Sequence, residues 1–181
     1  MASGTTRSVQ QSDKCTGYLL THPKRAGWRH VTVEALAVSD RSGDGVMLFS
    51  KTGDKLACLQ EVGGYYADAS ATRRCQVPVV SLDDYVDAAG LSRMDLIKID
   101  VQGAELFVLR GMSRALRQLR PIVIAEITGE EMFHQAHELL SAYGYRISCL
   151  EQFPVPGTAD QRYRNILGIP TPEGTRITTD R

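Results

Sequence analysis

The chain has 181 residues, of which 43% are hydrophobic and 23% are charged. This composition is typical of a soluble globular protein, and the length suits one domain with a substantial core. The 21 basic and 21 acidic residues give a net charge of +0, which argues against a nucleic-acid partner. The apolar runs are shorter than the ~20 residues of a membrane span, so we expect no membrane partner either.

The cysteines and histidines give no sign of a metal site. The four cysteines, Cys15, Cys58, Cys75 and Cys149, are scattered without a CxxC pair, which indicates neither a zinc site nor a redox motif. We expect buried thiols in a reducing compartment and hence a cytoplasmic protein. His134 and His137 stand three residues apart in a predicted helix without a third ligand, which favours a surface or hydrogen-bonded pair over a metal site.

The N-terminal stretch shows no apolar periodicity. Residues 1–14 are rich in Ser, Thr and Gln and lack the apolar centre of a signal peptide, so we expect them to be poorly ordered. Cys15–Thr21 contains a short apolar run and is a candidate strand. We therefore expect a poorly ordered segment over 1–30, a folded domain over 31–170 and a tail over 171–181.

A β-hairpin is predicted next. Val31–Ser39 is an apolar run typical of a strand, and turn-forming residues follow it at positions 40–45. Val46–Ser50 is the expected partner strand. Lys51–Ala71 is polar and rich in glycine, which predicts a long, mobile loop that serves either as a substrate lid or as an ordinary surface excursion.

A strand and a capped helix follow this loop. Cys75–Val80 predicts the strand. Ser81 is a good helix N-cap, with Asp84 three positions on, and the helix over Leu82–Ala89 is expected to end at Gly90.

The stretch Met94–Gly111 organises the rest of the chain. Its apolar run over Asp95–Val101 predicts a buried strand of a parallel sheet, followed by a glycine turn and the start of a helix. In open α/β sheets, ligands bind outside the carboxyl ends of the strands. Asp100, Gln102 and Glu105 are therefore the first candidates for chemistry.

Strands and helices alternate beyond this point, which is typical of successive βαβ units and predicts a parallel sheet. The outward face of the second helix carries Arg114, Arg117 and Arg120, which we expect to be solvated. The expected helices cover Ala104–Arg110, Met112–Leu119 and Glu130–Tyr143, and the expected strands cover Ile122–Ile127, Tyr145–Glu151 and Asn165–Ile169.

The motif MDLIKIDVQGAELFVLRG, followed by LRQLRPIVIAEI, resembles the core signature of FkbM-type S-adenosylmethionine-dependent methyltransferases. Gln102 stands where the family usually has an acid. The similarity continues in EALAVSDRSG and VPVVSLDDYV upstream and in AYGYRI and NILGIP downstream, so that it spans roughly Val31 to Pro170. The matching motif positions are Lys98, Asp100, Gly103, Glu105, Leu109, Gly111, Arg120, Pro121 and Glu126.

This resemblance implies a partial Rossmann-like class I methyltransferase sheet, α/β and mostly parallel, with an inserted β-hairpin. It also implies transfer of a methyl group from S-adenosylmethionine to a hydroxyl of a small molecule or a sugar. The expected catalytic residues are Asp100, Glu105 and Glu126. The expected cofactor contacts are Ser39, Asp40, Asp100, Val101, Gln102 and Gly103, and no metal is expected.

Each of these side chains also has a structural alternative. Asp100 and Glu126 end two strands that should be neighbours, and carboxyls at one rim can orient a cationic methyl donor or deprotonate a hydroxyl. However, Glu105 can instead cap its helix through the helix dipole, and Asp100 can pair with Lys98 on the same strand face. Asp40 can equally be a turn-forming residue.

The sequence departs from the family pattern on its N-terminal side. The family's donor site begins with a strand and a Gly-rich turn, and we find neither here. The edge of the strand Asp95–Val101 is then expected to lack a partner, unless Val31–Ser39, Cys15–Thr21 or a second copy in a homodimer pairs there. Two hypotheses follow: an active methyltransferase, or a truncated, catalytically inactive relative that acts as a binding module or is a fragment.

Overall fold

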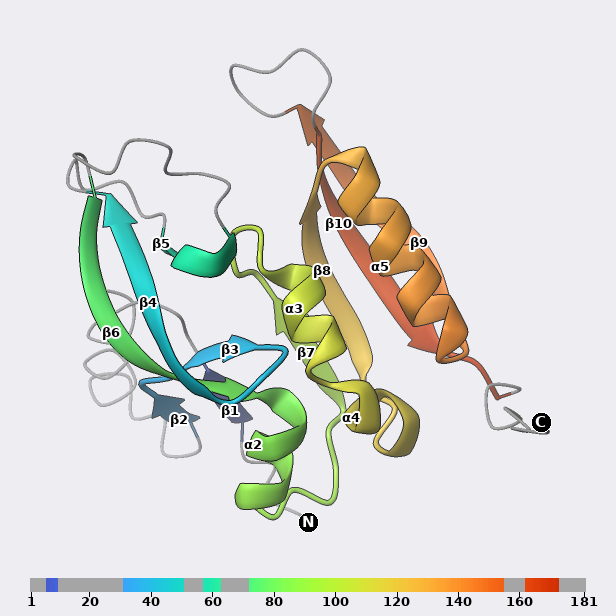
Figure 1. Cartoon of the computed structure of the whole chain (residues 1–181). Helices are drawn as coiled ribbons and strands as arrows, with labels where there is room; N and C mark the ends of the chain where they lie inside the picture. Colours follow the sequence, from blue (N-terminus) through green and yellow to red (C-terminus); the bar gives the residue numbers. More distant parts are fainter. Residues whose placement is uncertain (1–5, 10–30, 51–56, 63–71, 155–161, 173–181) are drawn as a thin grey trace, which may run out of the picture.

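The structure, a computed structural model, describes residues 6–9, 31–50, 57–62, 72–154 and 162–172. They form one two-stranded and two four-stranded sheets with helices packed on them (Figure 1). The first part contains β1 (Thr6–Val9), β2 (Val31–Glu34), β3 (Ala37–Ser39), β4 (Gly43–Ser50), β5 (Ala57–Leu59), the 3-10 helix η1 (Gln60–Val62), β6 (Thr72–Ser81) and α2 (Leu82–Ala88). The second part contains β7 (Leu96–Ile99), α3 (Glu105–Arg110), α4 (Ser113–Gln118), β8 (Ile122–Thr128), α5 (Glu130–Ala142), β9 (Tyr145–Pro154) and β10 (Arg162–Pro170).

The C-terminal sheet has the strand order β7–β8–β10–β9. β7 and β8 run parallel and are joined by α3 and α4, which confirms this predicted βαβ unit. β10 runs antiparallel to both of its neighbours, so the expectation of a mostly parallel sheet is wrong. The physical reason is that only residues 155–161 separate β9 from β10. A parallel connection needs a crossover of about a dozen residues or more, so β10 returns beside β9 in the opposite direction.

The N-terminal four-stranded sheet has the order β3–β6–β4–β5. The predicted hairpin between Val31–Ser39 and Val46–Ser50 is wrong, because β6 lies between β3 and β4. Val79 of β6 faces Ala37 in the parallel pair and Gly43 in the antiparallel pair. The turn after β3 therefore carries the chain across β6. The strands that are consecutive in sequence and pair antiparallel are β4 and β5.

Three local predictions change in the described residues. The strand expected over Val31–Ser39 is two strands, because β2 pairs with β1 whereas β3 pairs with β6. Lys51–Ala71, expected to be a loop, contains β5 and η1. β1 lies in the stretch 1–14 that we expected to be poorly ordered, and the candidate strand Cys15–Thr21 lies outside the described residues.

The helices begin and end close to their predicted positions. The Oγ of Ser81 accepts a hydrogen bond from the backbone N–H of Asp84 at 3.1 Å, which confirms the expected cap of α2. Gly111 separates α3 from α4, and Gly144 follows α5 with a positive φ of 72°. No helix in the described part of the chain is long and apolar enough to cross a membrane.

Asp83 fastens α4 to α2. Its carboxylate oxygens accept hydrogen bonds from the backbone N–H groups of Arg114 at 2.8 Å and Ala115 at 2.9 Å. These N–H groups belong to the first turn of α4, where they have no partner within the helix. Asp83, a side chain of α2, therefore caps the N-terminus of α4.

Arg120 differs from its predicted solvated position. Its guanidinium donates hydrogen bonds to the carbonyls of Tyr143, Gly144 and Thr171, and it lies over the ring of Tyr145. The carbonyls at the C-terminal end of α5 need such donors because the helix leaves them unpaired. Arg120 thus joins the turn before β8 to the end of α5 and to the residue after β10.

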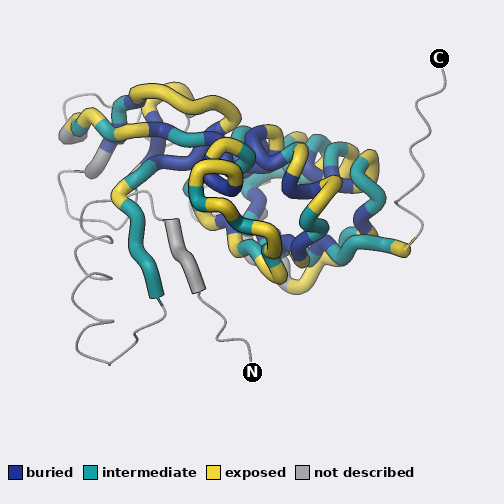
Figure 2. Tube along the Cα trace, turned by 90° about the horizontal axis from the view of Figure 1, so that it is seen from below, coloured by how far each residue is buried: buried dark blue, intermediate teal, exposed yellow. Residues whose placement is uncertain are grey.

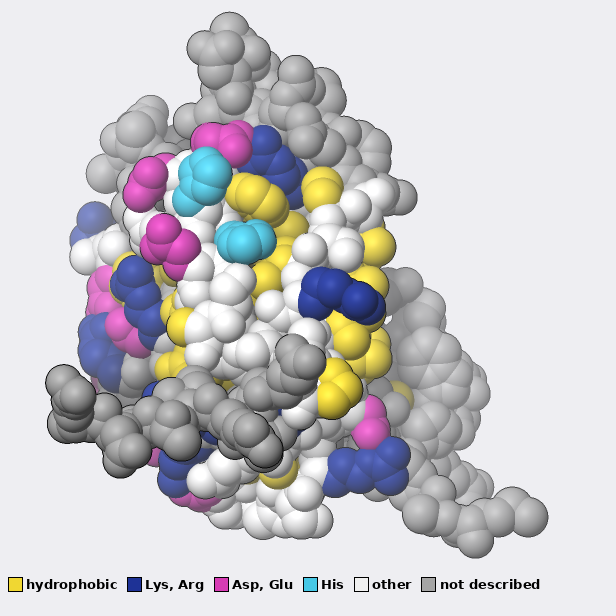
Figure 3. Space-filling model, turned by 90° about the vertical axis from the view of Figure 1, so that its right-hand side faces the viewer, with side chains coloured by type: hydrophobic (Ala, Val, Ile, Leu, Met, Phe, Trp, Pro, Cys, Tyr) yellow, Lys and Arg dark blue, Asp and Glu magenta, His cyan; other side chains and the backbone are white. Residues whose placement is uncertain are grey.

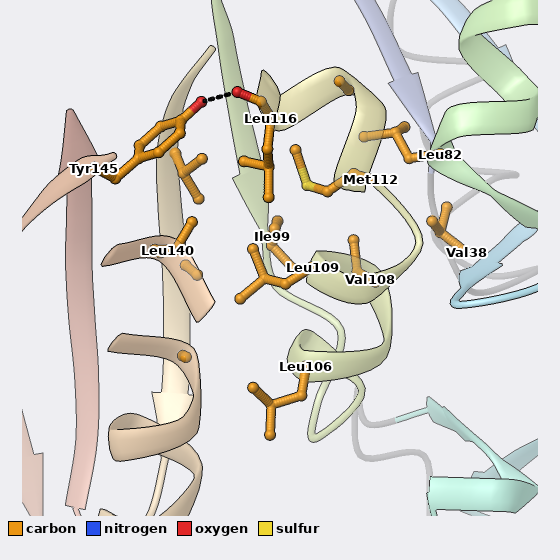
Figure 4. Close-up of a cluster of buried hydrophobic side chains, with 14 of the residues drawn as sticks. Val38, Leu82, Ile99, Leu106, Val108, Leu109, Met112, Leu116, Leu140 and Tyr145 are labelled. Atoms are coloured by element: carbon orange, nitrogen blue, oxygen red, sulfur yellow. Dashed lines mark hydrogen bonds between the residues drawn. The ribbon is translucent and has the colours of Figure 1, made fainter. Parts of the chain in front are cut away.

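The main core lies between the C-terminal sheet and the helices α3, α4 and α5, which cover one face of that sheet (Figures 1 and 2). Val123, Ala125 and Ile127 are buried on β8, and the residues between them are more exposed, so alternate positions face the helices. Each large side chain that is fully buried contributes about 1.5–3 kcal/mol. Figure 4 shows core side chains of the helices, among them Leu109, Met112, Leu116 and Leu140.

The described cysteines differ in burial. Cys58 of β5 is buried, as expected. Cys149 is exposed, so the expectation of buried thiols is wrong there, because β9 is an edge strand of its sheet.

Candidate functional site

The parallel pairing of β7 and β8 brings Asp100 and Glu126 together. In the parallel register Ile99 faces Ala125, so the next residues along the chain are neighbours: Asp100 directly follows the end of β7, and Glu126 lies within β8, two residues before its end. This register confirms that the two strands are neighbours. Ile99 and Ala125 are buried on the helix side, so Asp100 and Glu126 lie on the opposite face.

Two neighbouring side chains hold the Asp100 carboxylate. Lys98 Nζ donates to one oxygen at 2.6 Å and Gln102 Nε2 donates to the other at 3.1 Å. The ion pair with Lys98 is the structural alternative that the sequence left open, and the structure contains it. Both charged side chains remain partly exposed, so the pair is open to solvent and to a ligand.

Glu105 is turned into the protein. Its side chain is 2% exposed, and its carboxylate accepts hydrogen bonds from the backbone N–H groups of Val101 at 3.2 Å and of Gly103 at 3.1 and 3.0 Å. Burial raises the pKa of Glu105, although these N–H groups act in the opposite direction. These contacts bind the turn that precedes α3, and α3 itself has no side-chain cap hydrogen bond.

The turn that Glu105 holds has an unusual backbone. Gln102 has a φ of 53° and Gly103 has a φ of 101°, both in the left-handed region that residues with a side chain rarely occupy. The hydrogen bonds to Glu105 keep the turn in this conformation. Glu105 therefore fixes the backbone that presents Asp100 and Gln102 at the end of β7.

Glu126 is only partly exposed, and its neighbours act on its charge. Burial raises the pKa of Glu126, the negative charge of Asp100 raises it further, and Lys98 lowers it. The rim is thus a place where two carboxylates repel one another. A cation placed between them would relieve this repulsion.

Ser39 and Asp40 lie near the other end of α3. Ser39 is the last residue of β3 and Asp40 follows it, and the Ser39 Oγ donates to Asp40 Oδ1 at 3.3 Å. A Cβ on Gly111 would lie only 2.1 Å from the carbonyl oxygen of Ser39, so this pair contacts the C-terminal end of α3. Val101–Gly103 lie at its N-terminal end, about 9 Å away along a helix of this length. The structure does not bring the two predicted donor-binding groups together.

One residue of the rim was not predicted. Asn165 of β10 faces Glu126 in the antiparallel register, and directly paired residues share a sheet face. Its amide is therefore beside the Glu126 carboxyl. No local signal could have found Asn165, because its position depends on the insertion of β10 next to β8.

The two histidines of α5 contact side chains of their own helix. Figure 3 shows the two histidines of α5 on the surface, near acidic side chains. His134 Nε2 lies 3.4 Å from Glu130, and His137 Nδ1 lies 3.4 Å from the hydroxyl of Ser141. In the described ranges, no three His, Cys, Asp or Glu side chains are grouped closely enough to hold a metal ion.

The described part of the chain is thus a mixed α/β fold in which polar side chains of two parallel strands lie next to one another. The model of the family described as "Methyltransferase FkbM domain" matches residues 16–147. The chain therefore belongs to the FkbM methyltransferase family.

Two relatives illustrate the extent of the match. "Methyltransferase 1" of Beauveria bassiana (strain ARSEF 2860) is 34% identical over 79 residues, which are 42% of this chain and 32% of that protein. The crystal structure of Methyltransferase FkbM from Methylobacillus flagellatus KT aligns with a TM-score of 0.49 and 16% identity, over 88% of this chain and 36% of that one. The chain thus spans about a third of the length of each relative.

Proposed function

We propose that this chain is an S-adenosylmethionine-dependent methyltransferase domain that methylates a hydroxyl of a small molecule or a sugar. Membership of the FkbM family supports a methyltransferase. The observation that carries the assignment of the site is the pair of neighbouring carboxyls, Asp100 directly after β7 and Glu126 on β8.

The charge of the rim fits the methyl donor. When bound, S-adenosylmethionine supplies an activated methyl group on a positively charged sulfur. The Asp100 carboxyl pairs with Lys98 and has Glu126 beside it, so the two carboxyls can balance a positive charge placed between them. Because the negative charge of Asp100 raises the pKa of Glu126, a bound cation would act in the opposite direction and favour the ionised form of Glu126.

Glu126 is the better candidate for the proton acceptor. A general base works best when its pKa is near the working pH, and burial together with Asp100 moves the pKa of Glu126 upward. In this mechanism Glu126 accepts the proton of the acceptor hydroxyl, and Asn165 can orient its carboxyl. Glu105 acts only by positioning the turn, because backbone N–H groups occupy its carboxylate.

Ser39 and Asp40 are not part of this proposed site. They contact the C-terminal end of α3 at Gly111, whereas Asp100 and Glu126 lie on the sheet face away from the helices.

Calorimetric titration of the purified chain with S-adenosylmethionine and with S-adenosylhomocysteine tests the proposal. We expect micromolar binding of both compounds. Asp100→Asn should weaken the binding of S-adenosylmethionine by about tenfold, or 1.4 kcal/mol. It should weaken the binding of S-adenosylhomocysteine less, because the sulfur of that compound carries no charge. The matched control is Asp95→Asn, which removes an exposed, arginine-paired carboxylate at the other end of β7.

No heat with millimolar ligand, from a chain that circular dichroism shows to be folded, would overturn the proposal. Equal weakening by Asp100→Asn and Asp95→Asn would instead reject the rim as the donor site.

The second candidate is an inactive, methyltransferase-like module or fragment. One observation favours it: β7 is an edge strand in the described sheet, with β8 as its one described neighbour. This candidate predicts no binding of either compound by a stably folded chain.

A further inference from the structure

Lys98 places a positive charge beside a carboxyl of the proposed methyl-donor site. Its Nζ donates a hydrogen bond to Asp100 Oδ2 at 2.6 Å, and Gln102 Nε2 donates one to Oδ1 at 3.1 Å. Each oxygen of the Asp100 carboxyl therefore already has a partner from this chain. A ligand cation next to Asp100 has to share that carboxyl with an ammonium group of the same sign.

The strand pattern puts Lys98 on the same sheet face as both carboxyls. Ile99 is buried against the helices, so Lys98 and Asp100, one position before it and one after it, lie on the open face together with Glu126. The side chains of Lys98 and Asp100 are 58% and 39% exposed, so a ligand can reach both. The charge of Lys98 also acts on Glu126, because it lowers the pKa of that carboxyl.

The charges of these three side chains determine how strongly the site attracts a cation. One ammonium and two carboxylates together carry a single negative charge, which matches the single positive charge of a sulfonium. Without Lys98, two negative charges would face the same cation. Because like charges repel at these distances, Lys98 weakens the binding of a cation at Asp100 and Glu126.

We propose that Lys98 is a specificity-determining residue that sets the affinity of this site for S-adenosylmethionine relative to S-adenosylhomocysteine. This role rests on the proposed function, because it requires that the methyl donor binds at Asp100 and Glu126. The two compounds differ in one methyl group and in the charge of the sulfur. The ammonium of Lys98 therefore opposes the binding of the first compound and has little effect on the second, which makes the site sensitive to inhibition by the spent methyl donor.

Calorimetric titration of Lys98→Met with both compounds tests this role. Methionine keeps most of the apolar length of the lysine side chain and removes its charge. We expect S-adenosylmethionine to bind about three- to tenfold more tightly than it binds to the wild type, and S-adenosylhomocysteine to change by less than about twofold. The ratio of the two dissociation constants is the readout, because a general disturbance of the fold would change both constants alike.

Two further variants separate the charge of Lys98 from its packing and its position. Lys98→Arg keeps the positive charge and should keep the wild-type ratio. Arg93→Met is the matched control, because Arg93 forms an exposed ion pair with Asp95, two residues away, at the other end of β7. This control should leave both dissociation constants unchanged.

The outcomes distinguish a failure of this role from a failure of the proposed function. If Lys98→Met binds both compounds with the wild-type ratio, the role of Lys98 is overturned and the proposed function stands. If Lys98→Arg changes the ratio as much as Lys98→Met does, the charge is not the cause and the role is overturned as well. If neither compound binds to the folded wild type or to any variant, the proposed function fails and the role of Lys98 fails with it.

Discussion

The backbone N–H of Gly103 lies 3.1 and 3.0 Å from the two carboxylate oxygens of Glu105. This contact spans only two residues, yet it buries a carboxyl at the point where β7 turns into α3. The acid that begins the helix thus also holds the turn in front of it. Its ionisation and the conformation of the candidate site are therefore coupled.

The first prediction concerns the pH dependence that Glu105 contributes. Burial raises its pKa in the folded state above the ordinary value of 4.5, so the folded chain binds this proton more tightly than the unfolded chain. Stability from this group is therefore lost as the pH rises from about 4.5 through the raised pKa. Glu105→Gln should remove this loss. In urea unfolding at several pH values, the unfolding free energy of the variant relative to that of the wild type should therefore increase as the pH rises.

Glu138→Gln is the control for the first prediction, because it removes a carboxylate from the exposed face of α5. The difference between the two variants isolates the buried position. The prediction would be contradicted if the unfolding free energies of Glu105→Gln and Glu138→Gln changed with pH in the same way.

A second prediction follows from the close approach of α3 to β3. In Gly111→Ala the new Cβ would lie 2.1 Å from the carbonyl oxygen of Ser39 and 3.0 Å from the Cα of Asp40. Backbone atoms cannot rotate away, so the variant should lose about 3 kcal/mol of unfolding free energy in a urea titration. Gly90→Ala is the comparison: its site is open, and the positive φ alone should cost about 1 kcal/mol. Equal losses would show that the contact with Ser39 is not the cause.

A third prediction concerns the cap that α2 provides to α4. Asp83→Ala leaves the N–H groups of Arg114 and Ala115 without their acceptor, and we expect a loss of about 1–2 kcal/mol. Thermal unfolding followed by circular dichroism measures it. Asp87→Ala, which removes an exposed partner of the Arg114 guanidinium, should change stability little. The prediction fails if Asp83→Ala and Asp87→Ala unfold at the same temperature.

A fourth prediction concerns Arg120. In Arg120→Lys one ammonium replaces a planar guanidinium that reaches three carbonyls, so some of these hydrogen bonds are lost while the positive charge remains. We expect a loss of about 1–2 kcal/mol in urea unfolding. Arg117→Lys, at an exposed position over the ring of Tyr143, should be nearly neutral. If Arg120→Lys has the same unfolding free energy as the wild type, the hydrogen bonds from the guanidinium to the three carbonyls do not contribute to stability.

Local signals were sufficient for the elements around the central stretch. The cap at Ser81, the helix break at Gly111 and the parallel pair β7–β8 each depend on residues close together in sequence. The adjacency of Asp100 and Glu126 could also be predicted, because consecutive parallel strands end at the same edge of a sheet.

The rest depends on contacts between distant residues. The pairing of β3 with β6 and the insertion of β10 join strands that no turn signal connects, which is why the hairpin and the mostly parallel sheet were wrong. Asn165 reaches the rim only through that insertion. The burial of Glu105 could not be predicted either, because it depends on how α3 packs against the rest of the core.

The position of β10 also has a consequence for synthesis. β9 pairs in the described sheet with β10 alone, and β8 gains its second neighbour only from β10. A ribosome makes β8 and β9 first, and neither can be completed until residues 162–170 have emerged. A nascent chain that stalls before Arg162 would display two incomplete strands at once and would be the form most exposed to aggregation and to capture by chaperones.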